Sequence, residues 1–343
     1  MSVALQIPPA APGGSGIRYK RLLRLLVSAA ILSLLAAKTD WSKVSDAIRN
    51  LRWSYAAASF VILLTAQVVS AVRWRWLARP LGFNGPLRRY IGAYFVGMFF
   101  NLLLPTSVGG DAIRAVHLNA KSGRPMAAVL SVLLDRLSGL FVLLGVACVA
   151  AVVCPVPLPP WVQLAVFGCA LAAVIGLAFS PWLAHAVGRI PRTAKLAATV
   201  RDAFAVYRRE PRLIVSSTAL SAVVQASSVL QVGLLGMAVG LDIPWAVYGV
   251  AAPMVSLLTL LPVSLNGMGV REAAMAVFLA PVGVHRDVAV TVAFLWFLVQ
   301  TAAGLVGGLV YLTGRFPPPE VRYDDAVGPD PDQGRAGQRR PAA

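Results

Sequence analysis

One twelve-residue pattern occurs twice in this chain, and both copies interrupt an apolar run. Leu103–Arg114 reads LLPTSVGGDAIR and Leu260–Arg271 reads LLPVSLNGMGVR, so they share LLPxSxxGxxxR at an offset of 157 residues. The proline disrupts a helix because it lacks an N–H and clashes with the preceding turn. The small residues that follow allow a tight turn and close packing. Broken apolar segments at matching positions of two halves are typical of transporters built from repeats.

The composition places the chain in the membrane class. Hydrophobic residues make up 58% and charged residues 13%, and the mean hydropathy is +0.72. A soluble domain carries about 25% charged residues. The net charge of +17 comes from Lys and Arg gathered between apolar segments, as in cytoplasmic loops, so we expect no nucleic-acid partner. We expect neither metal nor cofactor, because no cysteine or histidine pair has ligand spacing and the cysteines are predicted to be small buried hydrophobes: Cys148, Cys154, Cys169, His117, His185 and His285.

The apolar segments predict an all-α polytopic integral membrane protein. About 20 mostly apolar residues span a bilayer, and we expect about six full transmembrane helices, at Leu22–Ala37, Ser54–Val72, Ala127–Val153, Trp161–Phe179, Leu213–Val239 and Val288–Thr313. Two further apolar arms, Tyr90–Leu104 and Trp245–Leu265, lead into the broken motifs and predict re-entrant hairpins. We expect a transmembrane domain over residues 18–314, between disordered cytoplasmic segments at 1–17 and 315–343.

The distribution of basic residues predicts opposite orientations for the two halves. The basic segments predicted to be cytoplasmic are the N-terminus, Arg73–Arg89, Arg114–Arg124 and Arg189–Arg212. The last of these also suits an amphipathic helix on the inner surface. Pro155–Pro160 and Gly240–Pro244 carry no positive charge and are predicted to be external. One hairpin then enters from inside and the other from outside, which makes residues 54–153 and 211–313 inverted repeats.

Each broken motif is predicted to form part of an anion site. A helix that resumes after the break has free N–H groups and the positive end of its dipole, and such an end attracts anions. An arginine fork suits phosphate. The predicted substrate-binding residues are Asn101, Ser107, Gly109, Gly110, Asp111, Arg114, Ser264, Asn266, Gly267, Arg271 and Glu272, and the structural breaks are Pro105, Pro262 and Gly269. Two alternatives remain: the arginines snorkel to the interface, and the asparagines cap freed backbone groups.

Two adjacent charges lie inside an apolar predicted helix. Asp135 and Arg136 are costly there unless paired, and neighbours in a helix do not face each other. We therefore predict that Arg136 pairs with Asp111 and Asp135 with Arg114. These charges either gate or couple transport, or lock helices together as structural ion pairs. Four glutamines either line the same polar interior or hold helices together: Gln67, Gln225, Gln231 and Gln300.

Three ordered stretches resemble the lysylphosphatidylglycerol synthase transmembrane-region family of flippase-like proteins. They are Asn101–Arg114, Ser131–Gly139 and Pro262–Ala274. The resemblance covers roughly Arg18 to Gly314 and implies a flippase-type fold that moves lipids between leaflets. Bifunctional members carry a cytosolic aminoacyl-transferase domain after the membrane part. We expect none here, since the chain ends about thirty residues after its last predicted helix. One departure is Met268, which stands where the first motif has Asp111, so the half-sites differ in charge.

These features predict translocation of an anionic phospholipid or a lipid-linked cell-envelope intermediate across the cytoplasmic membrane. The predicted partners are membrane lipids, anionic or polyprenyl-phosphate-linked, with envelope-synthesis enzymes as possible protein partners. Both termini are expected on the cytoplasmic side of the plasma membrane. No Gly-rich phosphate loop or HExxH motif is present, so we do not expect an enzyme. The alternatives are a membrane-embedded transferase acting on an envelope lipid and a non-transporting scaffold for envelope synthesis.

Overall fold

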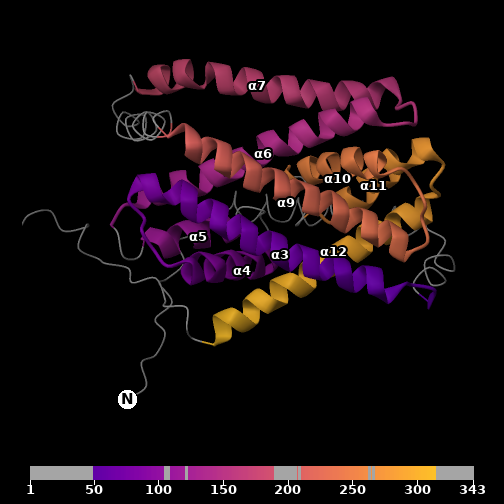
Figure 1. Ribbon diagram of the computed structural model, residues 1–343, viewed down its shortest axis with the longest axis horizontal. Coiled ribbons are helices and arrows are strands. Elements are labelled where there is room, and N and C mark those ends of the chain that lie inside the picture. Colours follow the sequence, from indigo (N-terminus) through magenta and orange to yellow (C-terminus); the bar gives the residue numbers. More distant parts are fainter. Residues whose placement is uncertain are drawn as a thin grey trace, which may run out of the picture.

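The computed structural model describes residues 49–103, 109–119, 123–188, 207, 210–261, 264 and 267–313. All regular secondary structure in these ranges is helical, and turns or loops join the helices (Figure 1). The elements are α3 (Trp53–Ala78), η1 (Arg79–Leu81), α4 (Leu87–Leu103), α5 (Gly109–Asn119), α6 (Pro125–Val153), α7 (Pro160–Gly188), α9 (Pro211–Ala238), α10 (Trp245–Leu260), α11 (Val270–Leu279), η2 (Ala280–Val282) and α12 (Arg286–Leu312).

Five of these helices are long and apolar enough to cross a membrane: α3 with η1, α6, α7 up to Phe179, α9 and α12. They coincide with five of the six predicted spans, which confirms a polytopic α-helical membrane protein. The sixth, Leu22–Ala37, lies outside the described residues, as does nearly all of the predicted amphipathic segment Arg189–Arg212. The shorter apolar helix α10 is the second predicted arm.

The helices of the two halves correspond one to one. A shift of 157 residues carries the first residues of α3, α4, α5 and α6 to within four residues of those of α9, α10, α11 and α12. Each hairpin packs on the last helix of the other half, because α4 lies against α12 and α10 lies against α6. The first helices of the two halves, α3 and α9, lie along each other. The Arg52 N–H donates to the carbonyl of Ala238 at 2.9 Å, so α3 begins where α9 ends. The two equivalent helices α3 and α9 therefore run antiparallel (Figure 1), as the predicted inverted repeat requires.

The α4 and α5 helices fold back on each other as a tight hairpin. Gly97 in α4 and Gly110 in α5 meet where a Cβ on Gly110 would lie 2.2 Å from the Gly97 carbonyl oxygen. At the open end of the hairpin, Arg89 of α4 donates to the carbonyl of His117 in α5 at 3.2 Å. A glycine is therefore needed at position 110 for the helices to touch, and a Cβ on Gly97 would be a tight fit at 3.1 Å from the Gly110 carbonyl oxygen. The break itself, residues 104–108, lies outside the described residues.

Replacing Gly110 with alanine is expected to prevent this hairpin from closing. The added methyl group meets backbone rather than a flexible side chain, so relief requires the helices to separate. Overpacking costs about 1–3 kcal/mol and occasionally more. Thermal unfolding in detergent should therefore show a clear loss of stability. Gly168→Ala is the matched control, because a Cβ there meets nothing within 4 Å. Equal stabilities of the two variants would contradict the proposed packing.

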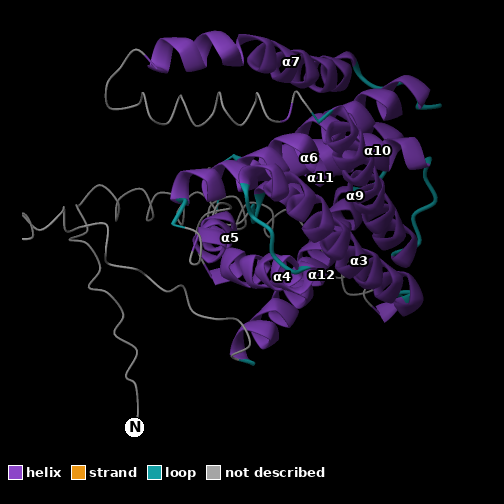
Figure 2. Ribbon diagram, turned by 60° about the vertical axis from the view of Figure 1, so that its left-hand side comes forward, coloured by secondary structure: helices purple, strands orange, loops and turns teal. Residues whose placement is uncertain are grey.

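The structure corrects two predictions. Arg73 and Arg75 were assigned to a cytoplasmic loop after Val72, but α3 continues to Ala78. The helix continues because its first proline is Pro80 and because Arg73 finds a partner inside the bundle. Among the cysteines, Cys169 is exposed on α7 and the other two are only partly buried. Helix α7 lies at the outer side of the bundle, against α6 (Figures 1 and 2), so most of its described apolar side chains face outward, whereas Val162 and Val166 are buried in the core.

Candidate functional site

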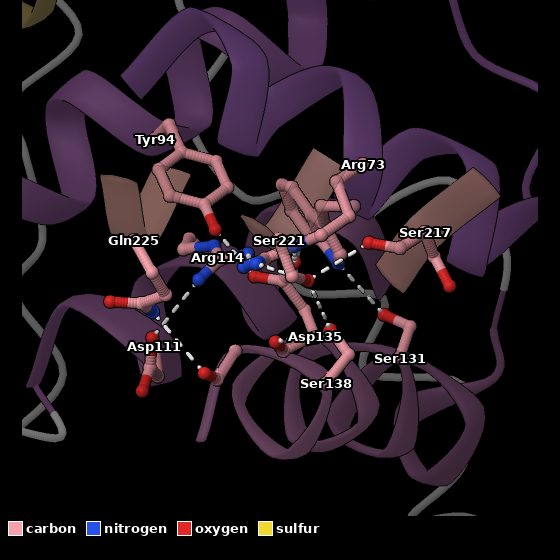
Figure 3. Close-up of polar contacts among 12 residues, drawn as sticks. Arg73, Tyr94, Asp111, Arg114, Ser131, Asp135, Ser138, Ser217, Ser221 and Gln225 are labelled. Carbon is pink, nitrogen blue, oxygen red and sulfur yellow. Dashed lines mark hydrogen bonds and ion pairs between the residues drawn. The ribbon is translucent and has the colours of Figure 1, made fainter. Parts of the chain in front are cut away.

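A buried carboxylate joins four helices near the middle of the first half. Asp135 in α6 is 1% exposed and accepts hydrogen bonds from Arg73 Nε in α3 at 2.8 Å and from Arg114 Nη2 in α5 at 2.7 Å. The Tyr94 hydroxyl of α4 donates to its second oxygen. Figure 3 shows these side chains converging on one point. We call Arg73, Tyr94, Arg114 and Asp135 the Asp135 cluster.

Helix α9 of the second half is bonded to this cluster. Arg73 Nη1 donates to Ser221 Oγ at 2.9 Å, and Gln225 Nε2 donates to the Gly139 carbonyl of α6 at 3.2 Å. A buried charge must be paired and hydrogen-bonded to be tolerated. Here two arginines and one tyrosine hydroxyl donate to a single carboxylate, and Ser221 accepts from one of those arginines, so the cluster requires five helices to be in place together.

Arg114 makes aromatic and ion-pair contacts, while its buried Nε makes no hydrogen bond. Its guanidinium lies 3.8 Å from the ring centroid of Tyr94 and 4.3 Å from that of Trp74, which are cation–π distances. It pairs with Asp135 and, at 3.2 Å, with Asp111. Asp111 also accepts from Arg136 Nε at 2.7 Å. Both predicted pairings are therefore confirmed. Asp111–Arg136 is the more exposed pair, since the Arg136 side chain is 42% exposed.

The matching arginine of the second half has no carboxylate partner among the described residues. Arg271 is 5% exposed, and Nη1 makes no hydrogen bond. Nη2 reaches Gln300 Oε1 at 3.4 Å, and the guanidinium lies 5.5 Å and 5.7 Å from the ring centroids of Trp296 and Phe297. The repeat offset explains the difference, because Val292 stands where the first half has Asp135.

Both arginines line one cavity of about 390 Å³ between the two halves. Four arginines and two aspartates contribute charge to it, so its formal charge is positive. The remaining polar lining is amide or hydroxyl. The central cavity is lined by Leu63, Gln67, Arg73, Tyr94, Gly97, Met98, Asn101, Leu102, Gly110, Asp111, Arg114, Asp135, Arg136, Gly139, Leu140, Leu143, Gln225, Ser256, Thr259, Leu260, Arg271, Trp296 and Gln300. A positive interior cavity at a repeat interface suits an anionic group.

An apolar groove of about 710 Å³ lies between α6, α9 and α10. The same three helices also line the central cavity. On α6 the groove residue Val142 is next in sequence to the cavity residue Leu143, and on α9 Ala226 is next to Gln225. The remaining groove residues are Gly145, Val146, Val149, Ala150, Val153, Val229, Leu230, Trp245, Ala246 and Gly249. A polar cavity and an apolar groove are thus built on the same helices.

The structure separates the predicted site residues into three groups. Seven line the central cavity: Asn101, Gly110, Asp111, Arg114, Asp135, Arg136 and Arg271. Five lie elsewhere: Gly109, Ser264, Gly267, Gly269 and Glu272. Four lie outside the described residues: Pro105, Ser107, Pro262 and Asn266.

Several predicted binding residues serve the helix ends. Asn101 Oδ1 accepts from the Gly110 N–H at 2.7 Å, so it satisfies a free donor at the start of α5. Glu272 Oε2 accepts from the Gly269 N–H at 2.7 Å and does the same for α11. Gly267 and Gly269 have φ values of +75° and +81°, which glycine adopts readily. Asn101 therefore caps a freed backbone group, which is one of the two alternatives that the sequence leaves open for it.

Four residues in or beside the Asp135 cluster are absent from the predicted site. The charge of Arg73 favours a loop, and no sequence pattern distinguishes Tyr94, Trp74 and Ser221 from the other residues of their apolar helices. Three of the four glutamines do line the cavity, whereas Gln231 is buried outside it. Within the described ranges, no three His, Cys, Asp or Glu side chains gather to hold a metal. The two aspartates of the cavity lining are instead bound by arginines.

Comparison with known proteins gives matches over most of the chain. Residues 21–308 match the Lysylphosphatidylglycerol synthase TM region family. A UPF0104 membrane protein of Methanothermobacter thermautotrophicus is 22% identical over 301 residues, covering 79% of this chain and 88% of that protein. A second UPF0104 membrane protein, from Methanocaldococcus jannaschii, is 23% identical over 29% of this chain and 30% of its own. The glycosyltransferase AglD of Haloferax volcanii is 28% identical over 37% of this chain and 20% of its own length.

Proposed function

Because the chain belongs to the Lysylphosphatidylglycerol synthase TM region family, we propose that it moves a phosphate-bearing lipid of the cell envelope across the plasma membrane. The headgroup enters the central cavity and the hydrocarbon chains stay in the bilayer. Both termini lie on the cytoplasmic side. The membrane lipid is the only substrate, and no cofactor takes part.

One observation carries the proposal: Arg271 is a buried cation with an unpaired donor facing a cavity. Its repeat counterpart Arg114 is bound by two aspartates, whereas Arg271 has one amide contact at 3.4 Å and two aromatic neighbours but no anion among the described residues. An uncompensated charge at this depth is costly. A lipid phosphate supplies the missing anion and accepts two hydrogen bonds from an arginine fork. Binding energy of this kind is available only to an anionic headgroup.

The groove between α6, α9 and α10 supports the same proposal. A lipid that crosses a membrane must keep its chains in apolar surroundings while its headgroup passes through a polar route. Here the apolar groove and the positive cavity share neighbouring residues on two helices. A free phosphate or a soluble sugar phosphate has no use for such a groove. The arrangement therefore favours an amphipathic substrate.

The resemblance to AglD raises a transferase as the second candidate. The name of that protein is glycosyltransferase, but the match covers 20% of its length. A transferase needs a group that accepts a proton. In the described cavity lining, Asp111 and Asp135 are each bound to two arginines, which favours their charged, structural role. Transport is therefore the better-supported function.

Reversible blockage of the central cavity tests the proposal directly. Ser256 lines the cavity, and Ser256→Cys is a small change. In a background lacking Cys148, Cys154 and Cys169, the variant is reconstituted into liposomes with chain-labelled phosphatidylglycerol. A bulky methanethiosulfonate reagent is expected to stop transbilayer movement, and dithiothreitol to restore it.

Ser216→Cys provides the matched control, because Ser216 is an exposed hydroxyl on α9 outside the cavity lining. Modification there should leave movement unchanged. Movement that continues after complete labelling of Ser256→Cys would contradict a route through the cavity. Lack of movement in the unmodified, folded protein, with every lipid offered, would contradict translocation itself and favour the transferase or the scaffold.

A further inference from the structure

The uncharged polar lining of the central cavity is rich in groups that bind hydroxyls. Amides and hydroxyls can each donate and accept. They come from both halves and from five helices: Gln67, Asn101, Gln225, Ser256, Thr259 and Gln300. All of these side chains except Gln67 already make one hydrogen bond within the protein. Each amide and hydroxyl keeps further donor or acceptor capacity, which suits a headgroup that carries hydroxyls beside its phosphate.

Three buried donors of residues in the same lining make no hydrogen bond. They are Arg271 Nη1, the indole Nε1 of Trp296, which is 3% exposed, and Arg114 Nε. A buried donor without a partner costs free energy that a ligand oxygen returns. All three groups only donate. The unused hydrogen-bonding groups are thus complementary to oxygen acceptors, and two of the three lie on α11 and α12, where Val292 replaces the carboxylate of Asp135.

The acids of the described lining are already occupied. Asp111 is bound by Arg114 and Arg136, and Asp135 by Arg73 and Arg114. An ammonium group entering the cavity would meet four arginines. Each carboxylate of the described lining is already paired with arginines and is not free to bind it. Like charges in a poorly solvated site repel strongly. The cavity is therefore unfavourable to a headgroup that contains an amine.

We propose that the central cavity selects headgroups made of a phosphate and a polyol and excludes those that carry an amine. This rests on the proposed translocation. The substrate chemistry is a phosphate ester of glycerol or of a sugar, on a hydrocarbon chain. An aminoacylated lipid or an ethanolamine lipid is rejected, although it carries the same phosphate.

Chain-labelled lipids with different headgroups test this selectivity in proteoliposomes of the full-length protein. The four probes are phosphatidylglycerol, a polyprenyl-phosphate-linked glucose, phosphatidylethanolamine and lysylphosphatidylglycerol. We expect at least one of the first two lipids to cross about tenfold faster than either amine-bearing lipid. This ratio corresponds to about tenfold tighter binding of its headgroup. Faster movement of phosphatidylglycerol alone identifies a phospholipid source, and of the glucose lipid alone a lipid-linked sugar.

Equal rates for all four probes would overturn the selectivity and leave translocation standing. Faster movement of lysylphosphatidylglycerol would also overturn it. Movement of none of them, with folded protein, would overturn both this inference and the proposed function. The outcomes therefore separate the two claims.

A designed carboxylate provides the second arm. Gln300 lines the cavity and its Oε1 lies 3.4 Å from Arg271 Nη2. Gln300→Glu places a carboxylate of nearly the same shape against Arg271, so it is expected to pair with that arginine, to slow phosphatidylglycerol about tenfold and to bring its rate close to that of lysylphosphatidylglycerol. Gln300→Met, which removes the amide contact without adding charge, should keep the preference of the native protein. An unchanged preference in folded Gln300→Glu would contradict the charge-based selection.

Discussion

Arg271→Gln is expected to slow lipid movement about ten- to hundredfold while the protein still folds. The glutamine keeps the hydrogen-bonding capacity toward Gln300 but removes the cation. Hydrogen bonds to charged groups contribute about 1.5–3 kcal/mol, which corresponds to that range in rate. Folding should be retained because no carboxylate in the described residues depends on Arg271. Initial rates of chain-labelled phosphatidylglycerol in proteoliposomes give the result.

Arg88→Gln provides the control for this loss of charge. Arg88 is exposed at the start of α4, outside the central cavity, so the same chemical change should leave the rate within about twofold, as expected for a surface substitution worth at most about 0.5 kcal/mol. A folded Arg271→Gln protein that moves lipid at the native rate would remove the central observation behind the proposed function. Arg271→Lys, which keeps the charge but loses the fork, should fall between the two.

Asp135→Asn is expected to have the largest effect on stability, about 3–5 kcal/mol. The substitution leaves Arg73 and Arg114 buried with no shared anion, and both side chains are nearly inaccessible to solvent. Five helices lose a common point of attachment. Thermal unfolding in detergent and the yield of monodisperse protein measure the change.

Two further variants identify the charge as the cause. Arg136→Gln breaks a partly exposed pair and should cost less than about 1 kcal/mol. Adding Arg73→Met to Asp135→Asn removes one uncompensated cation, so the double variant should be more stable than Asp135→Asn alone. If it is less stable, the loss in Asp135→Asn comes from packing rather than from unpaired charge.

The membrane class and the inverted repeat were predictable because they depend on long-range averages. Hydropathy over twenty residues located α3, α6, α7, α9 and α12, and the duplicated motif located both hairpins. The pairing of Asp135 with Arg114 was predictable for another reason: a charge inside an apolar helix demands a partner, and few were available.

The rest of the site depends on contacts between helices, which the hydropathy pattern of a single helix does not predict. Arg73 follows the apolar run directly, so charge alone placed it in a loop; its position inside the bundle became visible only with Ser221 and Asp135 around it. The roles of Arg114 and Arg271 were predicted to be alike because their motifs are alike. They differ because Asp135 and Val292 lie more than twenty residues from those motifs.

The unequal halves also have a consequence for the proposed translocation. In an inverted repeat with equivalent halves, exchanging the conformations of the halves would turn an inward-open state into an outward-open state without a change in energy. Among the described residues, only the first half supplies a carboxylate to its motif arginine. Translocation as proposed would therefore run between two states of unequal energy, and the state that keeps the Asp135 cluster intact would be the lower one. Lipid bound to Arg271 would have to stabilise the other state enough to populate it, so the protein without lipid would be open mainly to one leaflet.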